Sequence, residues 1–303
     1  MEDAIKKAQA LTEALPYIRQ FRNRIIVVKL GGSAQDDASL LRNIFIDCQI
    51  MLAVGMRPVV VYGGGKKISK AMKETGRSAK FIQGQRVTDA ATMAIVAQVL
   101  VDEVGSDLLT LLEDAGGTGF LLNGRDNAFL RAIKKTLPDL PDADLGLVGE
   151  PVAIDATPVH RAFEGVYWQD GRERIPLIAP IACGCGRESN ILYNVNGDTA
   201  AALIARDLHA EKLLFISDIP GVCRNKDDAA SIFSHLDRAD IYSLLQNGSI
   251  EGGMIPKVEA CLFALEGGVK KTHIVSGAQP HALLLEIFTR SGVGTEIVLE
   301  RTT

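Results

Sequence analysis

The chain has 303 residues, of which 47% are hydrophobic and 23% charged, and its formal net charge is −4. This weakly acidic balance gives no electrostatic reason to expect nucleic acid or an anionic membrane as a partner. No apolar run approaches the length of a membrane span, and the mixed charge of residues 1–7 is unlike a signal peptide, so we expect a cytoplasmic protein. The 5 cysteines are scattered, and the close pair Cys183 and Cys185 lacks a common zinc-binding spacing, so we expect reduced thiols.

The first 22 residues predict an amphipathic helix that precedes the first strand. Its apolar residues recur at helical spacing: Ile5, Ala8, Leu11, Leu15 and Ile18. Pro16 lies inside this pattern and predicts that the helix ends or kinks there. Two roles are open for the apolar stripe: it packs as a lid on its own domain, or it contacts another subunit.

Two predicted strands of the first half each end in a glycine turn. Buried strands are predicted over residues 25–30 and 58–62, with a helix over 36–54 between them. The residues at the turns are Lys29, Gly31, Gly32 and Ser33 after the first strand, and Gly63, Gly64, Gly65, Lys66 and Lys67 after the second. Glycine lets the backbone approach an anion, and the start of a helix attracts one. Two such turns in one βαβ unit predict an anion-binding site.

The segment that follows offers one further candidate. Arg86 comes after a polar stretch and could bind a carboxylate through two hydrogen bonds, although a surface ion pair is the plainer alternative. Thr88 is expected to cap a helix over residues 89–104. A short strand is predicted over 119–122, and residues 125–175 have the turn-rich pattern of irregular hairpins.

The second half continues the alternation of strands and helices. Strands are predicted over 175–181, 212–217, 272–275 and 295–299, and helices over 199–208, 239–246, 258–265 and 280–288. Asn194, Asn196 and Asp198 alternate in an extended segment and would project to one side, unless they form an Asn/Asp-rich helix cap. Lys257 follows a glycine-rich stretch and precedes the predicted helix over 258–265. Alternating strands and helices predict an α/β fold, a three-layer αβα sandwich around a central, mostly parallel sheet.

The chemistry that fits these elements is phosphoryl transfer. The chain has no G-x-x-x-x-G-K-[ST] motif, no kinase H-R-D signature, and no G-x-G-x-x-G on a strand-to-helix turn. It does have glycine turns after strands, a lysine in each half, an aspartate and an arginine. Phosphoryl transfer depends mostly on positioning and on charge stabilisation, which these groups supply.

Short motifs occur in a fixed order along the chain. They are Val-Val-Lys-Leu-Gly-Gly, Val-Tyr-Gly-Gly-Gly, Gly-Gln-Arg-Val-Thr-Asp, Asn-Val-Asn-Gly-Asp-Thr-Ala-Ala, Ser-Asp-Ile-Pro-Gly-Val and Gly-Gly-Met-Ile-Pro-Lys-Val. Together they resemble the amino acid kinase family, and within it the members that phosphorylate the side-chain carboxylate of N-acetyl-L-glutamate in arginine biosynthesis. The resemblance covers essentially the whole chain and implies ATP and Mg²⁺ as cofactors, with no residue of the chain assigned to the metal.

The resemblance implies roles for the matching residues. Lys29 would stabilise the transferred phosphoryl group from the substrate side, Lys257 from the nucleotide side, and Asp198 would orient both lysines. Substrate-binding residues by the same match are Gly64, Gly65, Arg86 and Asn194, and ATP-binding residues are Gly31, Gly32, Ser217, Asp218, Gly221, Val222, Gly253 and Met254. The chain would divide into an oligomerisation helix (1–22), an N-lobe for substrate binding and dimerisation (23–182) and a C-lobe for ATP (183–303).

The two ends of the chain resemble arginine-inhibited members that form hexamers as trimers of dimers. By this match the candidate arginine contacts are Tyr17, Lys212, His281, Glu286 and Gly294. The nitrogen-signalling PII protein is a partner of some members. The sequence departs from the usual family pattern at Tyr62, where His is usual, at Lys66, where Pro is usual, and at Ser33, where Asn is commoner.

Alternatives stay open at this point. One is a kinase for another amino-acid carboxylate, such as N-acylated aminoadipate or glutamate. The other is a non-catalytic arginine sensor of the same fold.

Overall fold

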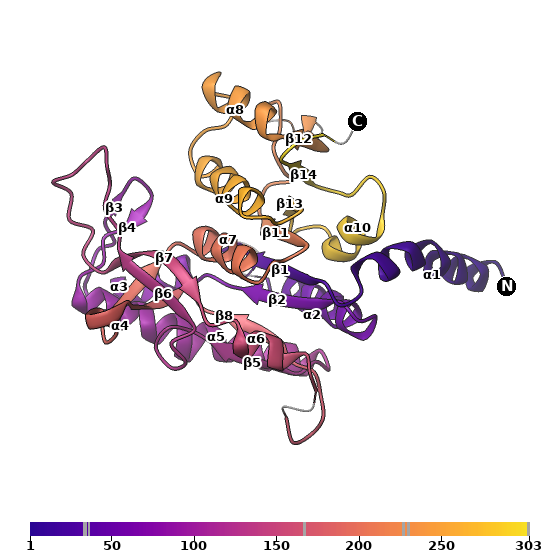
Figure 1. Cartoon of the computed structure of the whole chain (residues 1–303), viewed down its shortest axis with the longest axis horizontal. Helices are drawn as coiled ribbons and strands as arrows, with labels where there is room; N and C mark the ends of the chain where they lie inside the picture. The colour runs from indigo at the N-terminus through magenta and orange to yellow at the C-terminus, as the bar shows by residue number, and fades with distance from the viewer. Residues whose placement is uncertain (33–34, 36, 166–167, 226–227, 229–230, 302–303) are drawn as a thin grey trace.

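The middle layer of the structure, a computed structural model, is a single twisted sheet (Figure 1). Its strands are β1 (Ile25–Leu30), β2 (Arg57–Val61), β5 (Gly119–Leu122), β8 (Ile175–Ile178), β11 (Lys212–Ser217), β12 (His235–Asp237), β13 (Lys271–Ser276) and β14 (Thr295–Val298). The 8-stranded sheet has the order β12-β14-β13-β11-β1-β2-β8-β5, and β13–β14 is the antiparallel pair among parallel neighbours. The structure describes residues 1–303 except 33–34, 36, 166–167, 226–227, 229–230 and 302–303, and of residues 2–4 and 6–7 the backbone alone.

Helices cover both faces of the sheet. On one face lie α2 (Ala38–Ala53), α3 (Gly65–Glu74), α4 (Ala90–Ala97), the π-helix η2 (Gln98–Val104), α5 (Gly105–Asp114) and α10 (Ala282–Phe288). On the other lie α6 (Thr157–Ala162), α7 (Gly197–Asp207), α8 (Arg238–Gln246) and α9 (Met254–Glu266). Successive side chains of β1 point to opposite faces of the sheet. Ile26 and Val28 pack against the helices of the first face, and Val27 packs against those of the other. The predicted three-layer αβα fold is confirmed.

A small barrel and a hairpin stand beside the sheet. Strands β6 (Leu130–Lys134), β7 (Val148–Ile154), β9 (Ile181–Gly184) and β10 (Leu192–Val195) close the barrel, and β3 (Phe81–Ile82) pairs with β4 (Gln85–Arg86). The strand predicted over 175–181 is therefore two strands, β8 and β9, in two different sheets. The division into lobes stays a prediction, and its boundary between residues 182 and 183 falls inside β9.

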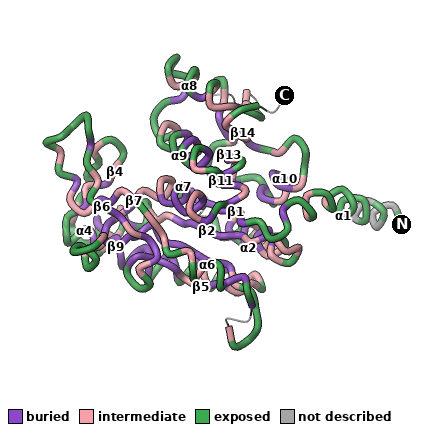
Figure 2. Tube along the Cα trace, viewed as in Figure 1, coloured by how far each residue is buried: buried purple, intermediate pink, exposed green. Residues whose placement is uncertain are grey.

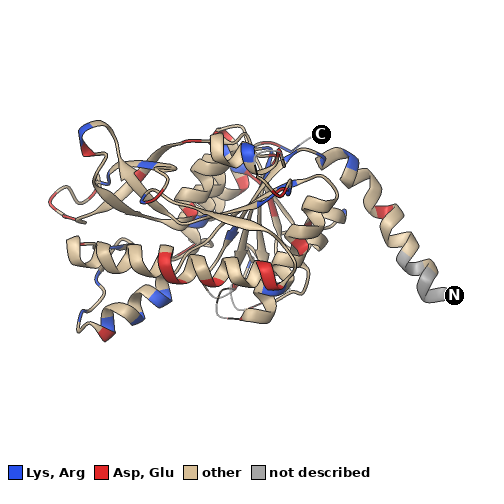
Figure 3. Ribbon diagram, turned by 90° about the horizontal axis from the view of Figure 1, so that it is seen from below, with Lys and Arg blue, Asp and Glu red and all other residues tan. Residues whose placement is uncertain are grey.

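Helix α1 (Glu2–Phe21) extends away from the sheet with the N-terminus at its far end (Figure 1). It continues through Pro16 to Phe21, so the helix predicted over residues 1–22 is confirmed and, of the two alternatives at the proline, the ending is excluded. Figure 2 shows the helix mostly exposed, and Leu11 is 73% exposed. Basic and acidic residues are interspersed over the ribbon (Figure 3). None of the helices in the described ranges is both long and apolar enough to cross a membrane.

Helix boundaries in the first half differ from the predictions. The helix expected over 89–104 continues through η2 and α5, and its cap is Asp89, which accepts a hydrogen bond from the Thr92 N–H, instead of Thr88. Asp37 caps α2 in the same way. The predicted first residue of that helix, Asp36, and Ser33 of the first glycine turn lie outside the described residues.

Candidate active site

Two lysines and an aspartate from three elements meet at the carboxyl end of β1. Lys29 Nζ lies 2.5 Å from Asp198 Oδ1, and Lys257 Nζ lies 3.1 Å from Asp198 Oδ2. Lys29 is on β1, Asp198 is in the first turn of α7, and Lys257 is in the first turns of α9. All three side chains are nearly buried. The sequence match that grouped these residues is thus realised as one contiguous cluster, in which two cations share one carboxylate.

Burial and charge oppose each other within this cluster. Burial would raise the pKa of Asp198, but the nearby charges of Lys29 and Lys257 outweigh it and hold the pKa below its ordinary value. Burial lowers the pKa of Lys29, with a further contribution from the like charge of Lys257. Lys257 Nζ also lies 5.1 Å from the centre of the Phe215 ring. The cluster therefore carries a net positive charge in a poorly hydrated place.

The glycine turn after β1 is held against the neighbouring strand. The Gly31 N–H donates to the Ile216 carbonyl of β11 at 2.8 Å, and a Cβ on Gly31 would lie 2.5 Å from that oxygen. Glycine is required here because any side chain would collide with the backbone of β11. The pairing of β1 with β11 places residues from both halves of the chain at one edge of the sheet.

A cavity of about 800 Å³ opens on the β11 side of the cluster. All the residues predicted to bind ATP line it: Gly31, Gly32, Ser217, Asp218, Gly221, Val222, Gly253 and Met254. Lys29 and Lys257 line it as well. Its size, its glycine-rich walls and its cationic end fit a nucleoside triphosphate.

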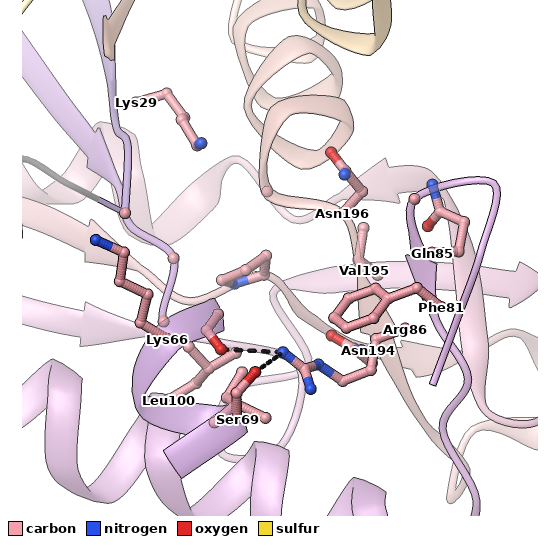
Figure 4. Close-up of a pocket in the computed structure, with 18 residues that line it drawn as sticks. Lys29, Lys66, Ser69, Phe81, Gln85, Arg86, Leu100, Asn194, Val195 and Asn196 are labelled. Carbon is pink, nitrogen blue, oxygen red and sulfur yellow. Dashed lines mark hydrogen bonds between the residues drawn. The ribbon is translucent and has the colours of Figure 1, made fainter. Parts of the chain in front are cut away.

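A second cavity, of about 620 Å³, opens on the β2 side (Figure 4). Gly64, Gly65, Arg86 and Asn194, the residues predicted to bind the acceptor, all line it. The Arg86 guanidinium donates from Nη2 to the Gly65 carbonyl and to Ser69 Oγ, both at 2.9 Å, so the cation is fixed in place before any ligand arrives.

Thr88 ties the two polar groups of this cavity together. Its buried hydroxyl donates to the Arg86 carbonyl at 2.7 Å and accepts from Asn194 Nδ2 at 3.1 Å. Asn196 follows Asn194 into the cavity and caps α7 through the Asp198 and Thr199 N–H groups. The helix-cap interpretation of this segment is confirmed, whereas the extended row of three is not formed, because Asp198 belongs to α7 and does not line the cavity.

The π-helix shapes the opposite wall of the same cavity. The Tyr62 hydroxyl, buried next to Gly105, donates to the Leu100 carbonyl at 3.1 Å. Leu100 lines the cavity, and a Cβ on Gly64 would lie 2.6 Å from Leu100 Cδ2. Tyr62 therefore fixes the backbone that places Leu100 against the second glycine turn. A π-bulge of this kind often marks a functional site.

A third cavity, of about 400 Å³, lies between α1 and the last elements of the chain. Tyr17, Lys212 and Glu286, three of the candidate arginine contacts, line it. Burial lowers the pKa of Lys212 to about 8. Glu286 is buried and accepts from the N–H of Val293 at 2.7 Å and of Gly294 at 3.0 Å. Gly294 thus does not line the cavity itself, but its N–H group holds the Glu286 carboxylate that does.

The structure does not bring His281, another candidate arginine contact, to this cavity. His281 has a left-handed backbone conformation (φ 55°), and its Nδ1 lies 2.6 Å from Asp47 Oδ1 of α2. His273 of β13 is buried behind two residues of the cavity: its Nε2 is 3.1 Å from Lys212 Nζ and its Nδ1 is 2.6 Å from Glu286 Oε1. A histidine inside a strand predicted to be buried was the available signal for it.

Several cavity residues were not predicted. Ser69, Phe81 and Gln85 line the acceptor cavity, and the Phe81 ring lies 4.8 Å from the Arg86 guanidinium carbon. Among the residues that the structure describes, no cluster of three or more His, Cys, Asp or Glu side chains is arranged to hold a metal ion.

Comparison with known proteins agrees with this geometry. A sequence model of the amino acid kinase family matches residues 24–276. The chain is 42% identical to an acetylglutamate kinase of Thermoanaerobacter pseudethanolicus over 97% of this chain and 94% of that one. It is 41% identical to an acetylglutamate kinase of Geotalea uraniireducens over 98% of this chain and 100% of that one.

A solved structure shares the fold. The N-acetylglutamate synthase of Neisseria gonorrhoeae, complexed with coenzyme A and N-acetyl-glutamate, superposes with a TM-score of 0.81 at 26% identity. The match covers 97% of this chain and 64% of the synthase chain. Taken with the cavities and the lysine–aspartate cluster, the comparisons show that this chain belongs to the amino acid kinase family, among its acetylglutamate kinases.

Proposed function

We propose that this chain transfers the γ-phosphoryl group of ATP to the side-chain carboxylate of N-acetyl-L-glutamate, giving N-acetyl-L-glutamyl 5-phosphate in arginine biosynthesis. The observation that carries the proposal is the Lys29–Asp198–Lys257 cluster, which lies between two cavities of suitable size. Similarity to acetylglutamate kinases over nearly the whole chain supports the same reaction.

The cluster suits a reaction between two anions. The acceptor carboxylate is already ionised, so no general base is needed, and the obstacle is its repulsion from the γ-phosphate. Lys29, which lines both cavities, would neutralise charge on the transferred group, and Lys257 would do so from the nucleotide side. Asp198 would hold both ammonium groups in position. Mg²⁺ bound by the phosphates would supply further positive charge.

The acceptor cavity suits an N-acylated amino acid. Arg86 would bind the α-carboxylate, Asn194 the N-acyl group, and the backbone N–H groups of Gly64 and Gly65 the reacting carboxylate. The nucleotide would occupy the cavity lined by residues 217–222 and 249–254.

Arginine would bind in the third cavity as a feedback inhibitor. Glu211, Glu286 and Glu296 line this cavity and supply carboxylates for a guanidinium, while Lys212 supplies a cation for the α-carboxylate. Tyr17 reaches the cavity from α1, so the helix that extends from the sheet contributes to it.

The exposed apolar stripe of α1 supports a homo-oligomer, a hexamer built as a trimer of dimers, in which α1 contacts another subunit. We place the enzyme in the cytoplasm. The PII signalling protein stays a predicted partner.

The test is ATP-dependent acyl-phosphate formation trapped with hydroxylamine, using N-acetylglutamate, glutamate and N-acetylaminoadipate, each with and without arginine. The proposal predicts turnover of N-acetylglutamate and its suppression by arginine. Turnover of another acceptor alone would replace the substrate assignment. Arginine binding without turnover of any acceptor would leave a sensor and overturn the kinase.

A further inference from the structure

Thr88 is a fully buried residue behind the acceptor cavity, and it does not line the cavity itself. Its hydroxyl has two partners, the Arg86 carbonyl at 2.7 Å and Asn194 Nδ2 at 3.1 Å. A carbonyl oxygen can only accept, so the single hydroxyl proton points to Arg86. The hydroxyl is then an acceptor toward Asn194, and the NH₂ of the side-chain amide is the group that must face it. This network decides the orientation of the Asn194 amide.

Leu147 fixes the distance between Thr88 and Asn194. Its N–H donates to the Thr88 carbonyl at 2.6 Å, and its carbonyl accepts from the Asn194 N–H at 2.9 Å. The Thr88 N–H donates to the Leu145 carbonyl at 2.9 Å. Gly146 has a positive φ of 69°, and a Cβ there would lie 2.3 Å from the Thr88 carbonyl oxygen, so the close approach requires glycine. The backbone therefore holds both ends of the Thr88–Asn194 hydrogen bond before any ligand binds.

The oxygen of the Asn194 amide is available to the acceptor. Asn194 lines the cavity, and Figure 4 shows its side chain next to Arg86. With Nδ2 turned to Thr88, Oδ1 is the atom of the amide that remains for a ligand. An amide oxygen recognises a hydrogen-bond donor, and an N-acylated amino acid carries one at its α-nitrogen.

We propose that Thr88 is a positioning residue for acceptor recognition: it holds the Asn194 amide so that Oδ1 accepts the N–H of the acylated α-amino group. An ester in place of that amide would bring an oxygen against Oδ1. Turning the Asn194 amide round would set Oδ1 against the Thr88 hydroxyl, whose proton would then have to leave the Arg86 carbonyl. Thr88 thereby selects acceptors with a donor at the α-position. The inference rests on the proposed acceptor and deepens that assignment.

The test measures how strongly each variant prefers an amide to an ester at the α-position. The ligands are N-acetyl-L-glutamate and its ester analogue L-2-acetoxyglutarate, in which an oxygen replaces the N–H. Affinities are measured calorimetrically with Mg²⁺ and a saturating non-hydrolysable ATP analogue. Thr88→Val removes the hydroxyl and keeps the shape, whereas Thr88→Ser keeps the hydroxyl. Thr92→Val is the matched control, because Thr92 is buried in α4, hydrogen-bonds the Asp89 side chain and does not line the cavity.

We expect the wild type and Thr88→Ser to bind the amide at least about tenfold more tightly than the ester, the effect of one hydrogen bond. In Thr88→Val the Asn194 amide can turn and offer its NH₂ to the ester, so the preference should fall to about twofold or less. Thr92→Val should keep the wild-type preference. Because both affinities are measured on one protein, a general loss of binding cancels in their ratio.

An unchanged preference in Thr88→Val, a wild type with no preference, or a Thr88→Ser variant that loses the preference would overturn the assignment. An equal fall in Thr92→Val would do the same, because the loss of any buried hydroxyl would then suffice. Thermal melts check that each variant is folded, and Thr88→Ala replaces Thr88→Val if the latter is unfolded. A wild type that binds N-acetylglutamate without phosphorylating it would refute the proposed reaction, and the amide-to-ester ratios would still decide the role of Thr88.

Discussion

Replacing Asp198 by Asn should destabilise the protein, and bound nucleotide should restore much of the lost stability. Asp198 Oδ1 and Oδ2 lie 2.5 Å and 3.1 Å from two lysine ammonium groups, all nearly buried. Removing one partner of a buried ion pair costs about 3–5 kcal/mol, and the lower end applies because the cluster borders two cavities. With about 3 kcal/mol lost, the melting temperature should fall by roughly 6–12 °C. The phosphates of a bound ATP analogue would then replace the missing negative charge.

The measurement is differential scanning calorimetry at pH 7, with and without a saturating non-hydrolysable ATP analogue. The pKa of Asp198 is lowered from 3.8 in the folded protein, so its stabilisation is complete above pH 3.8 and is lost only as the pH falls below that value. Asp47→Asn is the matched control, since it removes a fully buried carboxylate that pairs with His281 away from both active-site cavities. Nucleotide should reduce the difference in melting temperature between Asp198→Asn and wild type, and should leave the corresponding difference for Asp47→Asn unchanged. The electrostatic account would be refuted if Asp198→Asn melted at the wild-type temperature without nucleotide. It would also be refuted if nucleotide narrowed the difference in melting temperature from wild type equally for both variants.

Three further predictions follow from the same contacts. Tyr62→Phe should lower the free energy of unfolding by about 1 kcal/mol in urea titrations and raise the KM for the acceptor, because the Leu100 carbonyl loses one donor; an unchanged KM would separate the hydroxyl from the cavity wall. Arg86→Lys should raise the acceptor KM about tenfold or more with little change in kcat, because an ammonium lacks the planar fork; a loss confined to kcat would contradict the binding role. Burial lowers the pKa of Lys29 from 10.5, and the ammonium form is the one required, so kcat/KM should decline with rising pH before pH 10.5; a profile flat to that pH would count against Lys29.

The central strands were predictable because both their faces are buried. The apolar runs 25–30 and 212–217 coincide with β1 and β11 to the residue. The meeting of Lys29, Asp198 and Lys257 was predictable only through the family resemblance, because no spacing within one chain says that β1 and β11 are neighbours. The π-helix had no signal either, since the apolar pattern of a helix does not reveal where one extra residue enters a turn.

Local backbone conformation accounts for the position of His281 away from the third cavity. Its place in a C-terminal motif suggested an arginine contact, and in the structure the residue has a positive φ and its side chain pairs with Asp47. His273 was overlooked because strand periodicity marks it as an ordinary buried position. The family resemblance thus predicted residues that line all three cavities, whereas the position of the His281 side chain depends on local backbone conformation.

The central pairing of β1 with β11 has a consequence for synthesis. Strand β1 begins at Ile25 and β2 ends at Val61, whereas β11 begins at Lys212, so one long edge of β1 stays unpaired while the segment between them is made. An unpaired apolar edge strand is a template for association with other chains. Pairing of such distant segments is slow, and growing chains would be aggregation-prone until β11 leaves the ribosome. Truncations that end before residue 212 should therefore depend on chaperones and be poorly soluble.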